Sequence, residues 1–287
     1  MDKLSKIEVG GAPEGAQAVD RAMAILLLVS KMHTAGASLS QLVVQSGLKQ
    51  PTVHRLLLAL VRGGLVEQEE STKKYYLGYE SYVLGMLAGD RFGIQQQARG
   101  SVARLAHVSQ DTAFLTIRRG HFSVCMHREE GAYPIRAHVL SVGDRHPLGI
   151  GAGSIAILAA LNDDEVEEIL TDNAEIYKAH YPAVTAGKLR ELVGETREKG
   201  FSAHRGLVHP GSWGIGVAVY DEFGQPSAAL SIGAVDTRLS DEQRQQSLAA
   251  LMQEEAERLH ARLIVPMRNR GAPEKRRPVL KEASKRA

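Results

Sequence analysis

The stretch SLSQLVVQSGLKQPTVHRLLLALVRGG, residues 38–64, decides the fold of the N-terminal part of the chain. Ser38 and Gln41 have the spacing of a capping box, which predicts that a helix begins there. Gly47 is a residue type that commonly ends a helix, so this first helix should end at that position. A second helix should follow, because apolar residues recur at the helical spacing of one buried face: Val53, Leu56, Leu57, Leu60 and Val61.

The opposite side of the second helix is small, polar and basic. It carries Thr52, Arg55, Ala59 and Arg62, with Gln50 and His54 beside its start. Two short helices of this kind predict a helix-turn-helix whose second helix enters the major groove of DNA. An ordinary helical hairpin inside a core is the alternative that this stretch leaves open.

The flanking segments fit the same unit. Residues 16–33 predict a helix with two apolar faces, one buried in its own domain and the other against a partner chain. The first face comprises Val19, Ala22, Met23 and Leu26, and the second Ile25, Leu28 and Val29. Residues 65–68 and 75–77 predict a hairpin, or wing, with Lys73 and Lys74 at its tip for phosphate contacts. Residues 78–90 should form a connecting helix.

Composition indicates a two-domain, water-soluble, cytoplasmic protein. The chain has 287 residues and a net charge of +2, with one cysteine, which excludes an intramolecular disulfide. Neither a signal peptide nor a membrane-spanning run is expected. Residues 266–287 hold 8 Lys/Arg and 2 Asp/Glu, and the remainder holds 27 basic and 31 acidic residues. This basic end is expected to be a disordered tail, with attraction to phosphates as the alternative.

The segments AVDRAMAILLLVS, LSQLVVQSGLKQPTVHRLLLALVRGGLVEQ and KYYLGYESYVLG resemble the N-terminal domain of the IclR family of bacterial transcriptional regulators. The core from Gly47 to Leu60 is the most specific part of the likeness. Pro51 departs from the family, which commonly has a small hydroxyl residue there. Proline is tolerated in a first helical turn but removes one possible donor to DNA.

The second half, residues 91–265, alternates helical and strand patterns and predicts one α+β domain. Helices are expected at 94–109, 154–161, 163–170 and 186–199, with a closing helix capped by Ser240. Strands are expected at 112–118, 122–127, 135–140, 201–206, 213–220 and 226–233. This half resembles the family's effector-binding domain, which implies a GAF/profilin-like antiparallel sheet flanked by helices.

A glycine-rich run, PLGIGAGS at 147–154, opens one of these helices. A nucleotide loop is disfavoured because the run lacks the GK[ST] ending of a P-loop. Glycines required for close packing are a second interpretation. The preferred interpretation is an effector contact, in which helix N-terminal amides bind a small carboxylate.

The resemblance implies a set of pocket-lining residues: Leu148, Ala152, Gly153, His204, Ser212, Gly214, Ser231 and Gly233. This chain has Gly149 where the family usually has histidine and Ile155 where it usually has lysine. His204, Gly214 and Gly233 replace an acid, a cysteine and a serine found in some members. These changes indicate a wider pocket and a larger or more aromatic ligand.

No catalytic or metal site is expected. The histidines His121, His127, His138 and His146 lie in one region without a compact metal-ligand spacing, although the first two might converge in a hairpin. Cys125 is expected to be a buried thiol rather than a nucleophile. Arginines that could pair with an effector carboxylate are Arg128, Arg136, Arg145 and Arg205.

The sequence therefore predicts a ligand-responsive DNA-binding regulator of a catabolic operon, without catalytic activity or cofactor. It should bind double-stranded operator DNA and a small aliphatic or aromatic organic acid, as a homodimer or tetramer. The expected DNA contacts are Lys49, Gln50, Thr52, His54, Arg55, Arg62, Lys73 and Lys74. The expected organisation is an arm at 1–15, a winged helix-turn-helix domain at 16–77, a linker helix at 78–90, an effector domain at 91–265 and a tail at 266–287.

Two other functions remain open from the sequence. The first is an enzyme with an appended winged helix. The second is a protein–protein adaptor, which the low basicity of residues 1–89 allows, since they hold 9 Lys/Arg and 8 Asp/Glu.

Overall fold

The computed structural model describes residues 16–91, 93–135, 140–207 and 209–264. The predicted arm and tail, Arg136, His138 and most of the strand expected at 135–140 lie outside these residues. Within the described ranges, no helix combines the length and the apolar character needed to cross a bilayer.

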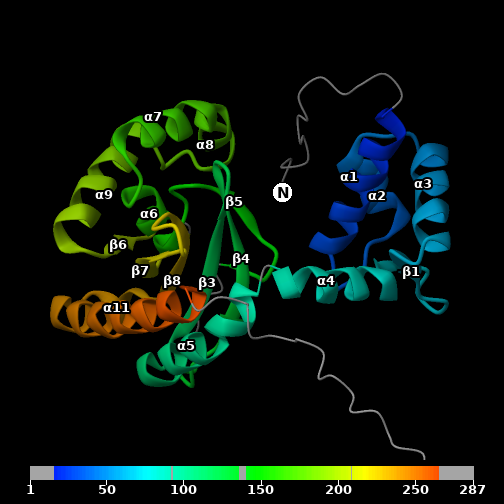
Figure 1. The fold of residues 1–287 in the computed structure, drawn as a ribbon. Helices are drawn as coiled ribbons and strands as arrows, with labels where there is room; N and C mark the ends of the chain where they lie inside the picture. Colours follow the sequence, from blue (N-terminus) through cyan, green and yellow to red (C-terminus); the bar gives the residue numbers. More distant parts are fainter. Residues whose placement is uncertain (1–15, 92, 136–139, 208, 265–287) are drawn as a thin grey trace, which may run out of the picture.

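Three helices and a two-stranded hairpin form the N-terminal unit (Figure 1). One apolar side of each helix enters its core, which includes Ile25 and Val29 of α1, Leu42 of α2 and Leu57 of α3. Of the two apolar faces of α1 predicted from the sequence, the second is the buried one, and the first is exposed at Val19 and Met23. The elements are α1 Gln17–Lys31, α2 Leu39–Ser46, α3 Gln50–Arg62, β1 Val66–Gln68 and β2 Tyr75–Leu77.

Hydrogen bonds confirm the predicted start and end of α2. The Gln41 N–H donates to Ser38 Oγ at 3.3 Å, and the Ser38 N–H donates to the Gln41 side chain at 2.9 Å. Gly47 ends the helix in the left-handed conformation with a φ of 67°. The chain then turns directly into α3, as a helix-turn-helix requires.

Helix α4, Tyr79–Arg91, follows the wing and lies between the two units in Figure 1. Its first turn is tied back to the N-terminal unit, because Ser81 Oγ donates to the Leu65 carbonyl at 2.8 Å. Several large apolar side chains of α4 are exposed: Tyr79, Tyr82, Leu84, Met86 and Leu87.

The second unit is a six-stranded antiparallel sheet with helices on both faces (Figure 1). The strand order is β5-β4-β3-β8-β7-β6; α5 and α11 cover one face, and α6 covers the other with α7, α8 and α9 outside it. This confirms the predicted α+β fold. The strands are β3 Thr112–Arg119, β4 Phe122–Glu129, β5 Arg145–Pro147, β6 Ser202–Arg205, β7 Ser212–Tyr220 and β8 Pro226–Val235. The helices are α5 Ile94–Ser109, α6 Ala152–Ala159, α7 Asp163–Asp172, α8 Ala174–His180, α9 Ala186–Lys199, α10 Asp236–Leu239 and α11 Glu242–Ile264.

Alternation along the strands gives the sheet two unlike faces. Toward α5 and α11 it presents Leu115, Ile215 and Leu230, which are completely buried in one aliphatic cluster. Toward α6 the same strands present small or polar residues such as Gly216 and Ser231. The first face therefore forms the main core, and the second has room for a cavity.

Some local features differ from the sequence-based expectations. The segments α8, β5 and α10 were not predicted as regular structure. The closing helix is not capped by Ser240, because the Gln243 N–H donates at 3.0 Å to Oδ1 of Asp241. Asp241 is also a favoured N-cap residue, so the spacing of Ser240 and Gln243 was misleading by one position.

Candidate functional site

Helix α3 presents a basic surface without internal partners. Burial of Val53, Leu57 and Leu60 fixes its rotation about its axis. Arg55 and Arg62 are both exposed, two helical turns or about 10 Å apart. Within the described part of the chain, neither guanidinium forms an ion pair or hydrogen bond. Both are thus available to an external anion.

The remaining predicted α3 contacts gather at its first turns. Lys49 is the N-cap, Gln50 and His54 are exposed, and Thr52 is half-buried. Pro51 lies in the first turn, where its missing N–H leaves the intrahelical ladder intact. These side chains and Arg55 form one end of the exposed α3 surface.

The two wing lysines have different environments. Lys73 is exposed, whereas Lys74 is half-buried and donates from Nζ to the Ala35 carbonyl at 2.7 Å. Glu69 and Glu70 occupy the turn beside them and are exposed. The described wing therefore offers Lys73 to a phosphate, next to two carboxylates, while Lys74 holds the wing to the turn that follows α1.

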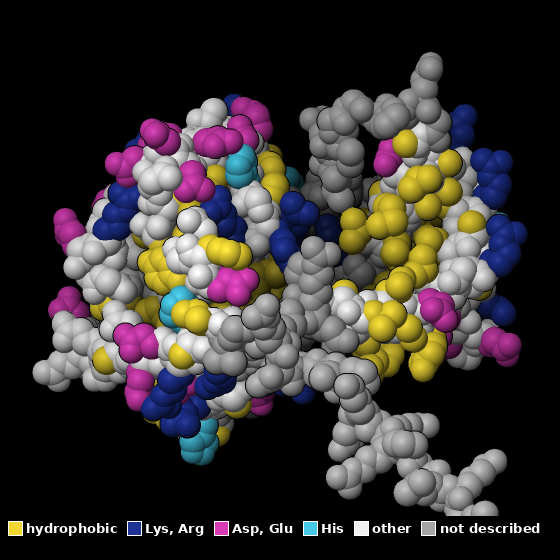
Figure 2. Space-filling model, in the orientation of Figure 1, with side chains coloured by type: hydrophobic (Ala, Val, Ile, Leu, Met, Phe, Trp, Pro, Cys, Tyr) yellow, Lys and Arg dark blue, Asp and Glu magenta, His cyan; other side chains and the backbone are white. Residues whose placement is uncertain are grey.

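Figure 2 shows the two surfaces of the N-terminal unit in one view. Dark blue side chains lie along its outer edge, where α3 is placed, and a yellow hydrophobic area covers the visible side of α1 and α4. The exposed apolar residues of this unit include Val19, Met23 and Leu27 of α1. The basic and apolar surfaces are separate.

A small cavity lies on the polar face of the sheet, against the first turn of α6. The strand register places His204, Gly214 and Gly233 in one row across β6, β7 and β8. Ser231 and Phe114 belong to the next row. The cavity brings together most of the predicted effector residues: Ala152, His204, Ser212, Gly214, Ser231 and Gly233.

His204 is buried without a hydrogen-bond partner among the described residues. Its exposed fraction is 9%, and neither ring nitrogen is paired. Burial lowers the pKa of His204 to about 4, so at pH 7 the ring is neutral and offers one donor and one acceptor. Since buried polar groups are normally paired, these nitrogens mark positions for the polar atoms of a ligand or water.

The first turn of α6 closes the cavity on the side opposite the sheet. Gly216 allows β7 to pass directly beneath this turn, because a Cβ there would lie 2.7 Å from the carbonyl carbon of Ala152. The turn begins at Gly151, whose φ of 89° favours glycine. The N–H groups of residues 152–154 lack intrahelical acceptors, and such groups bind anions.

Two predicted effector residues lie outside this cavity. Leu148 is fully buried in the apolar cluster around α7, α8 and α9, and its carbonyl accepts from the Tyr177 hydroxyl at 2.5 Å. Gly153 lines an adjoining recess with Thr116 and Cys125. Neighbouring Gly149 has a φ of 96°, which favours glycine, and a Cβ there would lie 2.9 Å from a methyl group of Leu189, which would have to move.

Several lining residues of the cavity were not in the predicted set: Phe114, Leu140, Gly151, Trp213 and Ile232. Phe114 is on the cavity face, whereas the side chains of Trp213 and Ile232 pack with the main core on the other face. The buried indole N–H of Trp213 has no partner within the described structure. Phe114 lies on the opposite face from its neighbours Ala113 and Leu115. Strand alternation in the sequence already separates Phe114 from Ala113 and Leu115. Which of the two faces borders a cavity became clear only from the register of the sheet.

The histidines do not converge in the hairpin of β3 and β4. His121 precedes β4 and lies 2.9 Å from Asp172 and 3.7 Å from Glu168 on α7. His127 lies toward the other end of β4, beside Glu129. The groups on His121, Glu168 and Asp172 are close enough to hold a divalent cation, but they already satisfy one another at an exposed surface.

The predicted thiol is buried, and the three described arginines that could have bound an effector carboxylate have partners within the protein. Burial raises the pKa of the Cys125 thiol to about 12, which keeps it protonated. Arg205 pairs with Asp236 and Arg128 with Glu130, and Arg145 lies over the ring of Phe122. Within the described residues, the cavity is lined by no Lys or Arg.

Comparisons with known proteins follow the same division. The family model described as the IclR helix-turn-helix domain matches residues 18–70, and that of the bacterial transcriptional regulator IclR C-terminal domain matches residues 86–261. Over 250 residues the chain is 27% identical to the HTH-type transcriptional regulator KdgR of Escherichia coli, with 86% of this chain and 93% of that protein covered. The regulator KipR of Bacillus subtilis is 25% identical over 224 residues, or 78% of this chain and 88% of that protein.

Solved structures share the fold. An IclR transcriptional regulator from Alicyclobacillus acidocaldarius superposes with a TM-score of 0.72 at 22% identity, covering 85% of this chain and 98% of that one. An IclR homolog from Microbacterium hydrocarbonoxydans, complexed with 4-hydroxybenzoate, gives a TM-score of 0.71 at 19% identity, covering 86% of this chain and 98% of that one.

Proposed function

Since the chain belongs to the IclR family of bacterial transcriptional regulators, we propose that it controls a catabolic operon by binding operator DNA through α3 and a small organic acid in the cavity beneath α6. The observation that carries the ligand proposal is His204, buried with two unpaired ring nitrogens at this cavity. Such a regulator acts in the cytoplasm, on chromosomal DNA, and needs no catalytic group or cofactor.

The proposed effector is a monocarboxylic acid with an apolar or aromatic body. Its carboxylate would accept from the backbone N–H of Ala152 at the start of α6, because the described cavity lining lacks a cation. Phe114 supplies an apolar wall, and neutral His204 can bind a hydroxyl or a carboxylate oxygen. The homolog complexed with 4-hydroxybenzoate supports an aromatic acid as the first probe.

We propose that residues 16–77 read DNA, 78–90 connect and 91–265 sense the ligand, with 1–15 an arm and 266–287 a basic tail. Helices α1 and α4 are proposed to join copies of the chain into a dimer or tetramer. Their exposed apolar residues support this, since such area is rarely left uncovered: Val19, Met23, Tyr82, Met86 and Leu87. A twofold assembly would place two α3 helices about 34 Å apart on a pseudo-palindromic operator.

A mobility-shift titration with the DNA upstream of the gene tests the DNA proposal. Arg55→Ala should weaken specific binding by about 1–3 kcal/mol if Arg55 contacts a guanine, with a smaller loss on random DNA. Lys73→Ala is the matched control and should weaken binding to both DNAs alike, as a phosphate contact does. An equal loss for Arg55→Ala on both DNAs would assign Arg55 to the phosphates instead.

Calorimetry with 4-hydroxybenzoate and a panel of aliphatic keto acids tests the effector proposal. His204→Leu should weaken binding at least about tenfold, the loss expected for one buried hydrogen bond. His209→Ala, an exposed histidine outside the cavity lining, should bind as the unmodified protein does. A bound acid that leaves operator affinity unchanged would separate ligand binding from regulation.

The enzyme and adaptor alternatives make opposite predictions. Conversion of any of these acids by the full-length protein without DNA would favour an enzyme. Failure to bind the upstream DNA at low salt would favour an adaptor, because phosphate-dominated binding strengthens steeply as salt falls.

A further inference from the structure

The end of β7 is an uncovered sheet edge. Strand β6 pairs with β7 only from Trp213 to Gly216, whereas β7 continues to Tyr220. Gly216 directs its carbonyl toward β6, since it accepts from Ser202 Oγ at 3.3 Å. Alternation therefore turns the N–H and C=O of Ala218 toward the same, open side. No hydrogen bond joins these two groups to the rest of the described chain.

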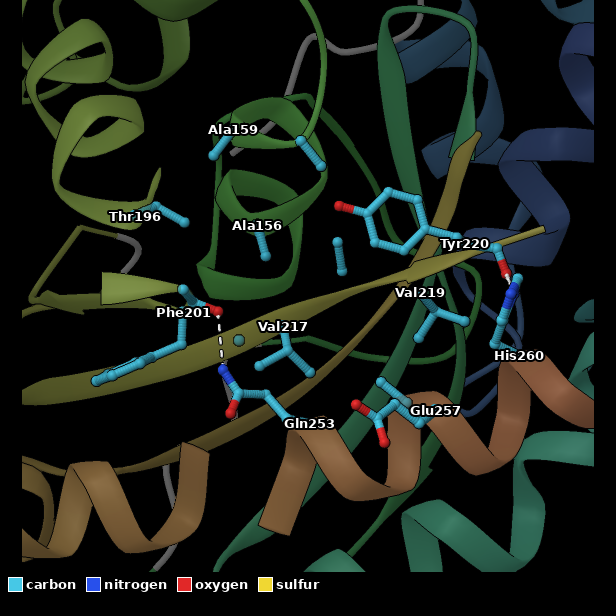
Figure 3. Close-up of a pocket in the computed structure, with 15 residues that line it drawn as sticks. Ala156, Ala159, Thr196, Phe201, Val217, Val219, Tyr220, Gln253, Glu257 and His260 are labelled. Carbon is cyan, nitrogen blue, oxygen red and sulfur yellow. Dashed lines mark hydrogen bonds between the residues drawn. The ribbon is translucent and has the colours of Figure 1, made fainter. Parts of the chain in front are cut away.

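A groove with a volume of about 300 Å³ runs along this edge (Figure 3). Ala156, Ala159 and Thr196 form one wall, and Gln253, Glu257 and His260 of α11 lie on the opposite side. Two hydrogen bonds span its ends: Gln253 Nε2 donates to the Gly200 carbonyl at 3.2 Å, and His260 Nδ1 lies 2.8 Å from the Tyr220 carbonyl. The space between is lined by alanine and valine.

The shape of the groove favours a single extended segment over the sheet edge of a second copy of the chain. A second copy of the chain has the same edge recessed between its own helices, so two such edges cannot meet. A single extended segment fits, because it needs only one strand's width and can pair with Ala218. Residues 217–220 span about 13 Å, room for a segment of similar length.

The charge of the groove indicates which side chains a bound segment should carry. Glu257 is the carboxylate of the lining, and no Lys or Arg of the described chain lines the groove with it. In the described residues Glu257 forms no ion pair. A basic side chain on the bound segment would therefore be favoured over an acidic one.

We propose that the groove between α6 and α11 binds an extended peptide segment of a partner protein, which adds a strand to the open edge of β7 and places a lysine or arginine beside Glu257. Small apolar side chains of the segment would lie against Ala156 and Val217. This site is separate from the effector cavity, which lies on β7 nearer to its start.

The test uses full-length protein and a fluorescein-labelled, end-blocked peptide, Thr-Val-Lys-Val-Thr, followed by fluorescence anisotropy. Saturable binding is expected below about 1 mM. N-methylation of the alternate amides that face β7 should weaken it about tenfold, through loss of one or two hydrogen bonds. Equal binding of the methylated peptide, or no binding at about 1 mM, would overturn the proposal.

Protein variants locate the site. Ala218→Pro removes the edge N–H and should weaken binding about tenfold, whereas the matched Ala218→Ser keeps it and should bind normally. Ala160→Phe fills the groove without altering the strand and should also abolish binding. Unchanged binding by both Ala218→Pro and Ala160→Phe would overturn the proposal. A change in sedimentation caused by Ala160→Phe would also overturn it, because the groove would then hold another segment of a second copy of the chain.

Discussion

The two faces of the six-stranded sheet are made by the same strands but serve different ends. Toward α5 and α11, Leu115 and Leu230 fill the space completely. Toward α6, Gly214 and Ser231 leave a cavity beside an unpaired histidine. The comparison teaches that alternate residues of one strand can fill a core and line a cavity. If the proposed effector binds in that cavity, stability and ligand binding should be separable by mutation.

The largest loss of stability should come from a substitution on the aliphatic face of the sheet. Leu115→Ala removes a fully buried side chain from the main core and should lower the free energy of unfolding by about 2–5 kcal/mol. Urea denaturation followed by circular dichroism measures it. If Leu115→Ala cost less than a substitution on the cavity face, the division of the two faces would be wrong.

Acid should lower the free energy of unfolding, because His204 on the cavity face becomes protonated more easily in the unfolded chain. Its pKa is about 4 in the folded protein, below the ordinary histidine value near 6.5. The unfolded chain therefore binds a proton first, and up to about 3 kcal/mol of stability should be lost as pH falls from 6.5 to 4. Comparison of wild type with His204→Gln across this range isolates the contribution, since the variant should lose less stability. Parallel curves for the two proteins would contradict the assignment.

Two glycines of β7 give a finer comparison. Gly216→Ala should destabilise the protein by about 1–3 kcal/mol, because the added Cβ would lie 2.7 Å from the backbone of Ala152. In Gly214→Ala the nearest atom is the Ala152 Cβ at 3.0 Å, with His204 at 3.5 Å, so a smaller loss is expected. Thermal unfolding of both variants measures the contrast, and equal losses would remove it.

The smallest effect should come from Ser231→Ala. Ser231 lines the cavity and is buried, but its hydroxyl makes no hydrogen bond within the described chain. The free energy of unfolding should change by less than about 1 kcal/mol, whereas affinity for the effector should fall if Ser231 binds it. Calorimetry and denaturation on the same sample give both values.

The sequence was most informative where the signal was local. Ser38, Gln41 and Gly47 determine the ends of α2 through neighbouring backbone groups, so the capping pattern was sufficient. The register of the sheet was not accessible in this way. It brings His204 beside Gly214 and Phe114 beside Ser231 from distant parts of the chain, and only the likeness to a family indicated some of these residues.

The missed elements depend on tertiary contacts. The short helix α8 is held by Tyr177, whose hydroxyl donates to the Leu148 carbonyl across the second core. Leu148, which was expected in the effector cavity, instead buries its side chain in this second core. The strand β5 has three residues and exists through its pairing with β4. Neither carries a periodic pattern long enough to predict it.

Helix α4 joins the N-terminal unit to the second unit. Among the described residues, only its first turn is hydrogen-bonded to the N-terminal unit. The hydrogen bonds that tie it to other described elements are those of Glu80 to Gly64 and Ser81 to Leu65. A 13-residue helix is marginal in water by itself, so its later turns gain rigidity when another surface covers Met86 and Leu87. If that surface belongs to a second copy of the chain, α4 would become stiffer as protein concentration rises. A movement in the sheet would then be transmitted to α3 more completely.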